Sequence, residues 1–135
     1  MKNINLFLSI GILIPVALGY GIAPKTVLPL VFDIRLDTVD MLNICRTIMV
    51  LYIGIIAFLL RGIFIKAQWQ NATLLNGVFM GSLAIGRLLS WILDGQPSFI
   101  LVFGFFGELG LSLFAFYQLR KFYKKTDSNT EGSFF

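Results

Sequence analysis

Three charged residues that interrupt apolar runs have the clearest potential for chemistry in this sequence. Arg46, Arg87 and Glu108 each stand within a long apolar stretch. A guanidinium in hydrocarbon costs at least about 2.5 kcal/mol on insertion scales, so each arginine needs a partner. Because a guanidinium can donate two parallel hydrogen bonds to a carboxylate or a phosphate, these residues predict an ion-pair network or an oxyanion-binding site.

Further polar residues could complete the lining of such a site. On a helix, residues three, four or seven positions apart share a face. Asn43 lies three positions before Arg46, and Ser90 and Asp94 lie three and seven positions after Arg87. Tyr20 lies near the outer end of the first apolar run. The expected polar lining is Asn43, Ser90, Asp94 and Tyr20.

The composition indicates that membrane helices position these residues. Of the 135 residues, 57% are hydrophobic and 13% are charged, and the mean hydropathy is +0.84. A soluble domain has about 25% charged residues. The apolar runs cover residues 4–23, 41–60, 72–93 and 99–119.

Each run is long enough to cross a hydrocarbon core of about 30 Å, at a rise of about 1.5 Å per residue. We therefore predict an all-α fold, a four-transmembrane-helix bundle, as a single domain over residues 1–125. A disordered polar tail is expected over residues 126–135.

The distribution of positive charge predicts the orientation of the bundle. The connections at 24–40 and 94–98 contain only two cations, Lys25 and Arg35. Seven cations fall at the N-terminus, in the middle loop and in the C-terminal tail: Lys2, Arg61, Lys66, Arg120, Lys121, Lys124 and Lys125. Under the positive-inside rule both termini are cytoplasmic. We expect a multi-pass protein of the bacterial inner membrane, with membrane lipids rather than nucleic acid as partners of the basic segment 120–125.

With that topology the three intramembrane charges lie at similar depths. Arg46, Arg87 and Glu108 are about 9, 10 and 15 Å below the outer surface. One carboxylate could then meet both guanidiniums, leaving one positive charge in a low dielectric. Either Asp94 or Asp40 neutralises that charge, or the site awaits a small anion or an anionic lipid head group.

Other kinds of chemistry find little support. The chain has no histidine, which excludes a His-ligated haem and a His general base. The single cysteine, Cys45, can form no internal disulfide, and no Cys or His cluster could hold a metal. We expect no cofactor, and a non-enzymatic role is favoured over catalysis.

Helix packing is also indicated. Gly77 and Gly81 form a small-xxx-small pattern that allows another helix to approach closely. The turn over residues 94–98 is tight, so the last two helices are expected to be antiparallel neighbours. The connection over residues 24–40 is apolar enough to rest in the outer interface or to fold over the mouth of the bundle.

The sequence resembles an uncharacterised bacterial membrane family, domain of unknown function 4345. The resemblance lies in RTIMVLYIG at 46–54, FMGSLAIGRLLSWILDGQPS at 79–98 and the following glutamate. It implies a four-helix bacterial membrane protein without an established activity, and a more distant resemblance to DoxX-type subunits suggests a redox-accessory role. The positions that match the family pattern are Arg46, Tyr52, Gly54, Gly86, Arg87, Ser90, Asp94, Gly95, Pro97 and Glu108.

Three functions stay open at this point. The first is an outward-facing site that binds or transports a small anion or a lipid head group. The second is an accessory or scaffold subunit, with a structural charge network and small-residue faces for a second copy or a partner membrane protein. The third is a membrane enzyme or redox-accessory protein that acts with a quinone or a lipid.

Overall fold

The computed structural model describes residues 2–32 and 34–131, with side chains described up to Phe122. The elements of this part are all helical, which confirms the predicted all-α class. Their order is α1 (Ile4–Gly21), α2 (Pro24–Phe32), α3 (Val39–Phe64), a short 3₁₀ helix η1 (Lys66–Gln68), α4 (Trp69–Asp94) and α5 (Phe99–Glu131).

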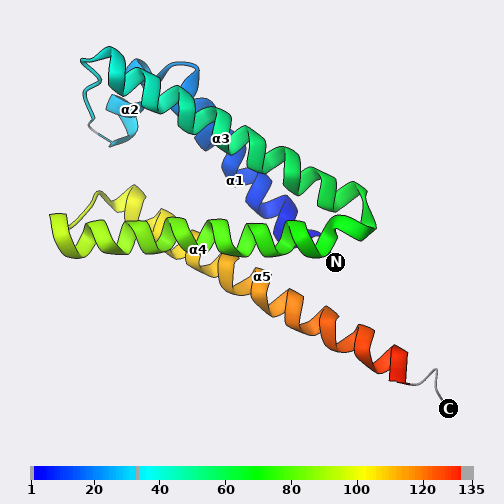
Figure 1. Cartoon of the computed structure of the whole chain (residues 1–135). Helices are drawn as coiled ribbons and strands as arrows, with labels where there is room; N and C mark the ends of the chain where they lie inside the picture. The colour runs from blue at the N-terminus through cyan, green and yellow to red at the C-terminus, as the bar shows by residue number, and fades with distance from the viewer. Residues whose placement is uncertain (1, 33, 132–135) are drawn as a thin grey trace.

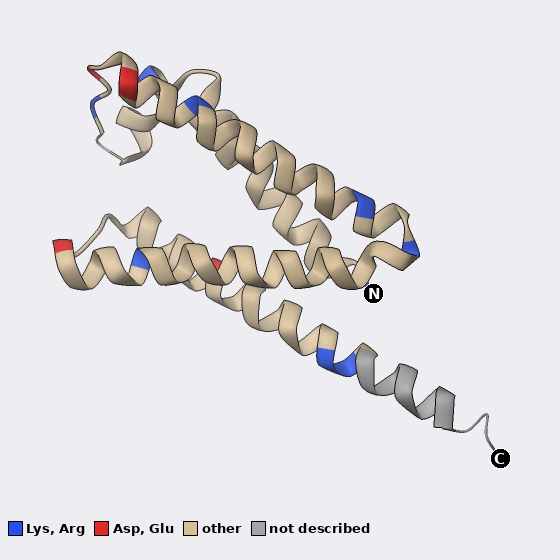
Figure 2. Cartoon of the chain, in the orientation of Figure 1, with Lys and Arg blue, Asp and Glu red and all other residues tan. Residues whose placement is uncertain are grey.

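Within the residues that the structure describes, four stretches are long and apolar enough to cross a membrane: Ile4–Gly21, Val39–Phe64, Lys66–Asp94 and Phe99–Phe122. Charged residues are sparse along the middle of these helices (Figure 2). Large apolar side chains stay outside the core, among them Leu93 at 78% and Phe103 at 73% exposure. Because a soluble chain rarely exposes so much apolar surface, the outer faces of the helices are suited to lipid.

The helix bounds differ from the predicted runs where capping residues act. α3 begins at Val39 because the Thr38 side chain accepts a hydrogen bond from the Met41 backbone N–H at 3.2 Å. The connection over residues 24–40 contains α2, whose first residue is Pro24, a position where the missing N–H of proline costs nothing. This segment is therefore more ordered than a plain loop.

The end of α5 differs from the predicted tail. The helix continues to Glu131, so the backbone at 126–131 is helical where a disordered tail was expected from residue 126. Extending an existing helix adds a hydrogen bond per residue without the cost of nucleation. The remainder of the expected tail, residues 132–135, lies outside the described residues.

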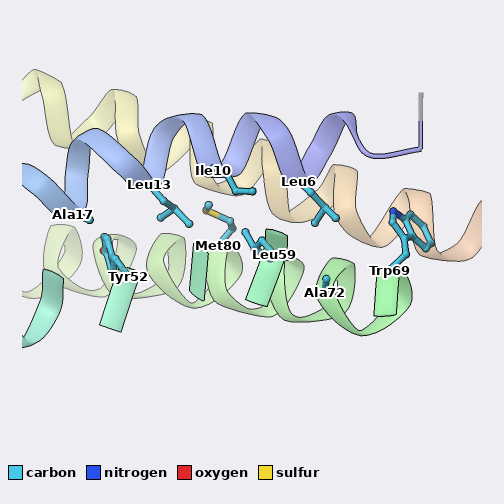
Figure 3. Close-up of a cluster of buried hydrophobic side chains, with 9 residues drawn as sticks. All are labelled: Leu6, Ile10, Leu13, Ala17, Tyr52, Leu59, Trp69, Ala72 and Met80. Atoms are coloured by element: carbon cyan, nitrogen blue, oxygen red, sulfur yellow. The ribbon is translucent and has the colours of Figure 1, made fainter. Parts of the chain in front are cut away.

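The helices pack as two antiparallel pairs, α1 with α3 and α4 with α5 (Figure 1). The pairs are joined where α3 meets α4, beside η1, and from there α3 and α4 spread apart toward their other ends. A cluster of buried apolar side chains packs between α1, α3 and α4 (Figure 3). It contains Leu6, Ile10, Leu13, Ala17, Tyr52, Leu59, Trp69, Ala72 and Met80.

Glycine sets the contact between α3 and α4. A Cβ atom added at Gly62 would lie 2.1 Å from the Cβ of Ala72, far inside contact distance. Only glycine at this position lets the two backbones come so close, so Gly62 holds the two helical pairs together.

The expected close packing of α4 on α5 is confirmed. The Ser112 hydroxyl donates a 2.8 Å hydrogen bond to the Gly77 carbonyl, and a Cβ atom at Gly81 would lie 2.9 Å from the same hydroxyl oxygen. The tight turn is also present, with Gly95 at φ +102°, in the left-handed region that favours glycine.

Candidate functional site

The centre of the candidate site is an ion pair between α4 and α5. Arg87 Nε donates to Glu108 Oε2 at 2.7 Å, and Arg87 Nη2 donates to Glu108 Oε1 at 2.9 Å. The side chains are 27% and 11% exposed, respectively. This two-point geometry is the strongest that an arginine forms with a carboxylate, and the pair carries no net charge.

A cavity of about 230 Å³ opens beside the pair. Its wall comes from four α-helices: α4 supplies Arg87, α2 supplies Phe32, α1 supplies Ile12, Val16 and Tyr20, and α5 supplies Ile100, Leu101, Phe103, Gly104, Gly107, Glu108 and Leu111. We call it the ion-pair cavity. Apart from the pair and the Tyr20 hydroxyl, the side chains that line it are apolar.

Tyr20 is held at the cavity by other aromatic rings. Its ring lies edge-on to Tyr52 of α3, with centroids 6.4 Å apart, and Tyr52 in turn lies edge-on to Phe79 of α4 at 5.5 Å. This row links three helices at the level of the site. It leaves the Tyr20 hydroxyl, which can donate and accept, on the same cavity as the ion pair.

A second cavity, of about 240 Å³, adjoins the first between α1 and α2. The two share Val16, Tyr20, Phe32 and Ile100 in their walls. The second adds only apolar or glycine positions, such as Leu28 and Gly19. Because the two cavities share these wall residues, we refer to them together as the recess along α1, with the Arg87–Glu108 pair in the wall of the first cavity.

Arg46 does not join the pair. Arg46 and Asn43 are both exposed and line a separate hollow whose walls all come from α3. The buried face of α3 carries Cys45 and Tyr52, and a helix turns by about 100° per residue, so the residue after Cys45 points away from it. The prediction that Arg46 joins Arg87 and Glu108 rested on similar depth alone, and it is wrong because the rotation of α3 turns Arg46 away from them.

Ser90 and Asp94 lie together, but away from the cavity wall. Ser90 Oγ donates to Asp94 Oδ2 at 2.9 Å, and both residues are exposed near the end of α4. Of the predicted site residues, the structure thus brings together Arg87, Glu108 and Tyr20. Asp94 forms no ion pair with Arg46 or Arg87 in the described part of the chain, where the ion pair of Arg87 is with Glu108.

Comparison with known families places the chain. The family model described as domain of unknown function (DUF4345) matches residues 1–119. The chain belongs to this family. The match confirms the resemblance drawn from residues 46–54 and 79–98, whereas the more distant resemblance to DoxX-type subunits is not shown. No curated protein and no solved structure matches the chain.

Several cavity residues of this DUF4345 chain were missed by reasoning from polar residues alone. Ile12 and Val16 line the ion-pair cavity with Tyr20 at four-residue spacing on α1, and Gly104 lies one turn before Glu108 on α5. An added Cβ at Gly104 would lie 3.7 Å from the Arg87 Cζ, so the guanidinium rests against the α5 backbone. The four-residue spacing was the available signal.

A second polar cluster of the DUF4345 chain lies deep between α1 and α4. Asn76 Nδ2 donates to Ser9 Oγ at 2.8 Å and to Asn5 Oδ1 at 3.4 Å, and all three residues are 0% exposed. Such buried polar contacts hold membrane helices together. In the described part of the chain, no three His, Cys, Asp or Glu side chains are close enough to hold a metal.

Proposed function

We propose that this chain is a multi-pass protein of the bacterial inner membrane, with both termini in the cytoplasm, that binds an amphiphilic small molecule. The polar head of the ligand would meet Arg87 and Tyr20, and its apolar part would lie in the recess along α1 and α2. The observation that carries the proposal is an apolar recess with a bidentate ion pair in its wall.

The donors in the wall of the recess support head-group recognition. The bonds to Glu108 use Nε–H and one Nη2–H of Arg87, so Nη1 remains as a donor for a bound group. The Tyr20 hydroxyl adds a second donor on the same cavity. Ester, carbonyl or phosphate oxygens are the acceptors that fit these groups.

The charge balance favours a lipid-like ligand over a small free anion. Glu108 neutralises Arg87, and the exposed Arg46 lines a different hollow. The surplus positive charge that would attract a free anion is therefore not gathered in the cavity. Hydrogen bonding to the head and burial of the apolar part would supply the binding energy instead.

The scaffold alternative rests on the ion pair itself. A bidentate bridge from α4 to α5 fixes the register of two helices without any ligand. In that case the recess would hold only loosely bound membrane lipid. A substitution that fills the recess would then not remove any specific ligand from the protein.

Native mass spectrometry of protein extracted in a mild detergent tests the proposal. Val16→Phe would narrow the recess, because Val16 lines both cavities, and it leaves the Arg87 and Glu108 side chains themselves unchanged. Ile14→Phe is the matched control, since Ile14 is on the same helix, 45% exposed and outside both walls. We expect the wild type and Ile14→Phe to retain one amphiphile and Val16→Phe to lose it.

The mass of the retained molecule assigns its class. A quinone would favour the redox-accessory role, and a glyceride or phospholipid would favour lipid binding. If the wild type retains nothing specific, or if both variants retain as much as the wild type, the ligand proposal is wrong and the ion pair is structural.

A further inference from the structure

A further hollow lies away from the ion pair, between the beginning of α4 and the later part of α5. Its volume is about 930 Å³. α4 contributes Gln70, Asn71 and Leu74, and α5 contributes Tyr117, Leu119, Arg120 and Lys121. We call it the basic groove. The proposed amphiphile site does not use any of these residues.

One end of the basic groove is polar and positively charged. Arg120 and Lys121 are both exposed, and none of the described residues that line the groove is acidic. The Lys121 ammonium lies over the Tyr117 ring, 5.9 Å from its centroid, which holds the cation at the groove wall. Gln70 and Asn71 line the same hollow, and each side-chain amide carries two N–H donors, one of which Asn71 uses toward Gln68 Oε1 at 3.5 Å.

The other end of the groove is apolar. Leu74 lies one turn beyond Gln70 on α4, and Tyr117 lies one turn before Lys121 on α5. Their exposed fractions are 49% and 59%. The polar residues near the start of α4 and in the later part of α5 therefore lie at one end of the groove. The apolar residues of both helices lie at the other end, toward the membrane interior.

We propose that the basic groove binds an anionic glycerophospholipid. Its phosphate would lie between Arg120 and Lys121, with the amides of Gln70 and Asn71 as further donors, and its acyl chains would cover Leu74 and Tyr117. Charge complementarity and the matching polarity gradient carry the assignment. A free phosphate or a nucleic acid would use the cations but would leave the apolar wall uncovered.

Lipid titration of the full-length protein, followed by native mass spectrometry, tests the assignment. The ligands are dioleoylphosphatidylglycerol, which is anionic, and dioleoylphosphatidylcholine, which has no net charge. Arg120→Gln/Lys121→Gln removes the two groove cations. Arg61→Gln/Lys66→Gln is the matched control, because it removes the same charge from exposed positions outside the groove.

We expect the groove variant to bind phosphatidylglycerol at least about tenfold more weakly, since each cation near an anionic lipid surface contributes about 1 kcal/mol. The control should change this affinity by less than about twofold. Leu74→Ser, which keeps both cations, should also weaken phosphatidylglycerol binding. All of these side chains are exposed or at the surface of the bundle, so the melting temperatures of the variants should match that of the wild type.

Three results would overturn the assignment. Equal losses in the groove and control variants would mean that overall charge, not the groove, attracts the lipid. Equal affinities for the two lipids would exclude recognition of an anionic head. Full displacement by millimolar inorganic phosphate would identify a free-anion site instead. None of these results bears on the amphiphile retained at the ion pair, so the two proposals fail separately.

Discussion

Arg87 is stable inside an apolar helix because one carboxylate satisfies it at two points. The two hydrogen bonds of 2.7 and 2.9 Å bring opposite charges together at the same level of α4 and α5. Desolvation of either charge alone would cost several kcal/mol. The pair is therefore more sensitive to the loss of one partner than to the loss of both.

The first prediction concerns this asymmetry. Glu108→Gln removes the negative charge and leaves the Arg87 guanidinium in a low dielectric, so the free energy of unfolding should fall by about 2 kcal/mol. The double variant Arg87→Met/Glu108→Leu removes both charges and should recover at least half of that loss. Thermal unfolding in detergent, followed by circular dichroism, measures both changes.

If the double variant is less stable than Glu108→Gln, the ion pair stabilises the fold by more than the mutual neutralisation of its two charges. The two remaining single variants, Arg87→Met and Glu108→Leu, complete a double-mutant cycle that gives the coupling energy directly.

The second prediction separates the two arginines. A shared charge network would make Arg46→Ala as harmful as Arg87→Ala. Because Arg46 is exposed on α3 and lines a hollow of its own, Arg46→Ala should change the free energy of unfolding by less than about 0.5 kcal/mol. Arg87→Ala should lower the melting temperature by several degrees in the same assay. Equal effects would show that Arg46 also has a buried partner.

Arg87 and Arg46 show which part of the site could be predicted from the sequence and which part could not. Glu108 was identified as the partner of Arg87 because depth along adjacent antiparallel helices can be counted from a short turn. Arg46 was grouped with them on depth alone. The rotation of α3 depends on packing of Cys45, Tyr52 and Leu59 against its neighbours, which a single helix sequence does not determine.

Among the helices, the contact of α3 with α4 depends most closely on one position. Gly62 leaves room for the Ala72 methyl group, and no other residue type at that position would fit without a shift of backbone. Gly54, just over two helical turns earlier on α3, has nothing within 4 Å of an added Cβ.

The third prediction compares these two glycines. Gly62→Ala would place two methyl carbons 2.1 Å apart, so the helices must separate, at a cost of about 1–3 kcal/mol. Gly54→Ala meets open space and should stabilise the protein by up to about 1 kcal/mol through helix propensity. Melting temperatures of both variants check the difference, and a tolerated Gly62→Ala would contradict the close approach of α3 and α4.

The helices themselves were largely predictable, and their partners only in part. Long apolar runs identify the four long helices, and Gly77 with Gly81 correctly indicated close packing of α4. The helix α2 was not predicted, because its short run of apolar residues broken by Pro29 carries no clear periodicity. The contact made by Gly62 was also missed, since nothing adjacent in the sequence marks it.

For the chain as a whole, orientation in the membrane follows from charge rather than from packing. The sequence has seven cations in the segments that we predict to be cytoplasmic and two in the connections that we predict to be outside. The helical arrangement is compatible with this count, because η1 and the start of α1 lie at one end of the bundle and the α4–α5 turn lies at the other (Figure 1).

The fourth prediction tests that orientation. On a Cys45→Ser background, Gln96→Cys in the α4–α5 turn should react with a membrane-impermeant maleimide in intact spheroplasts. Lys66→Cys in η1 should react only after lysis, because the positive-inside rule places it in the cytoplasm. Mass spectrometry of the labelled protein provides the readout, and the opposite labelling pattern would reverse the proposed topology.

The zero net charge of the Arg87–Glu108 pair has an electrical consequence. A unit charge moved across a membrane gains or loses about 2.3 kcal/mol per 100 mV. Because the two charges cancel within one bidentate contact, the site favours an uncharged head group, whose entry moves no net charge through the membrane field and should be insensitive to the transmembrane potential. Two arginines sharing one carboxylate would instead have favoured an anionic ligand, whose entry would depend on that potential.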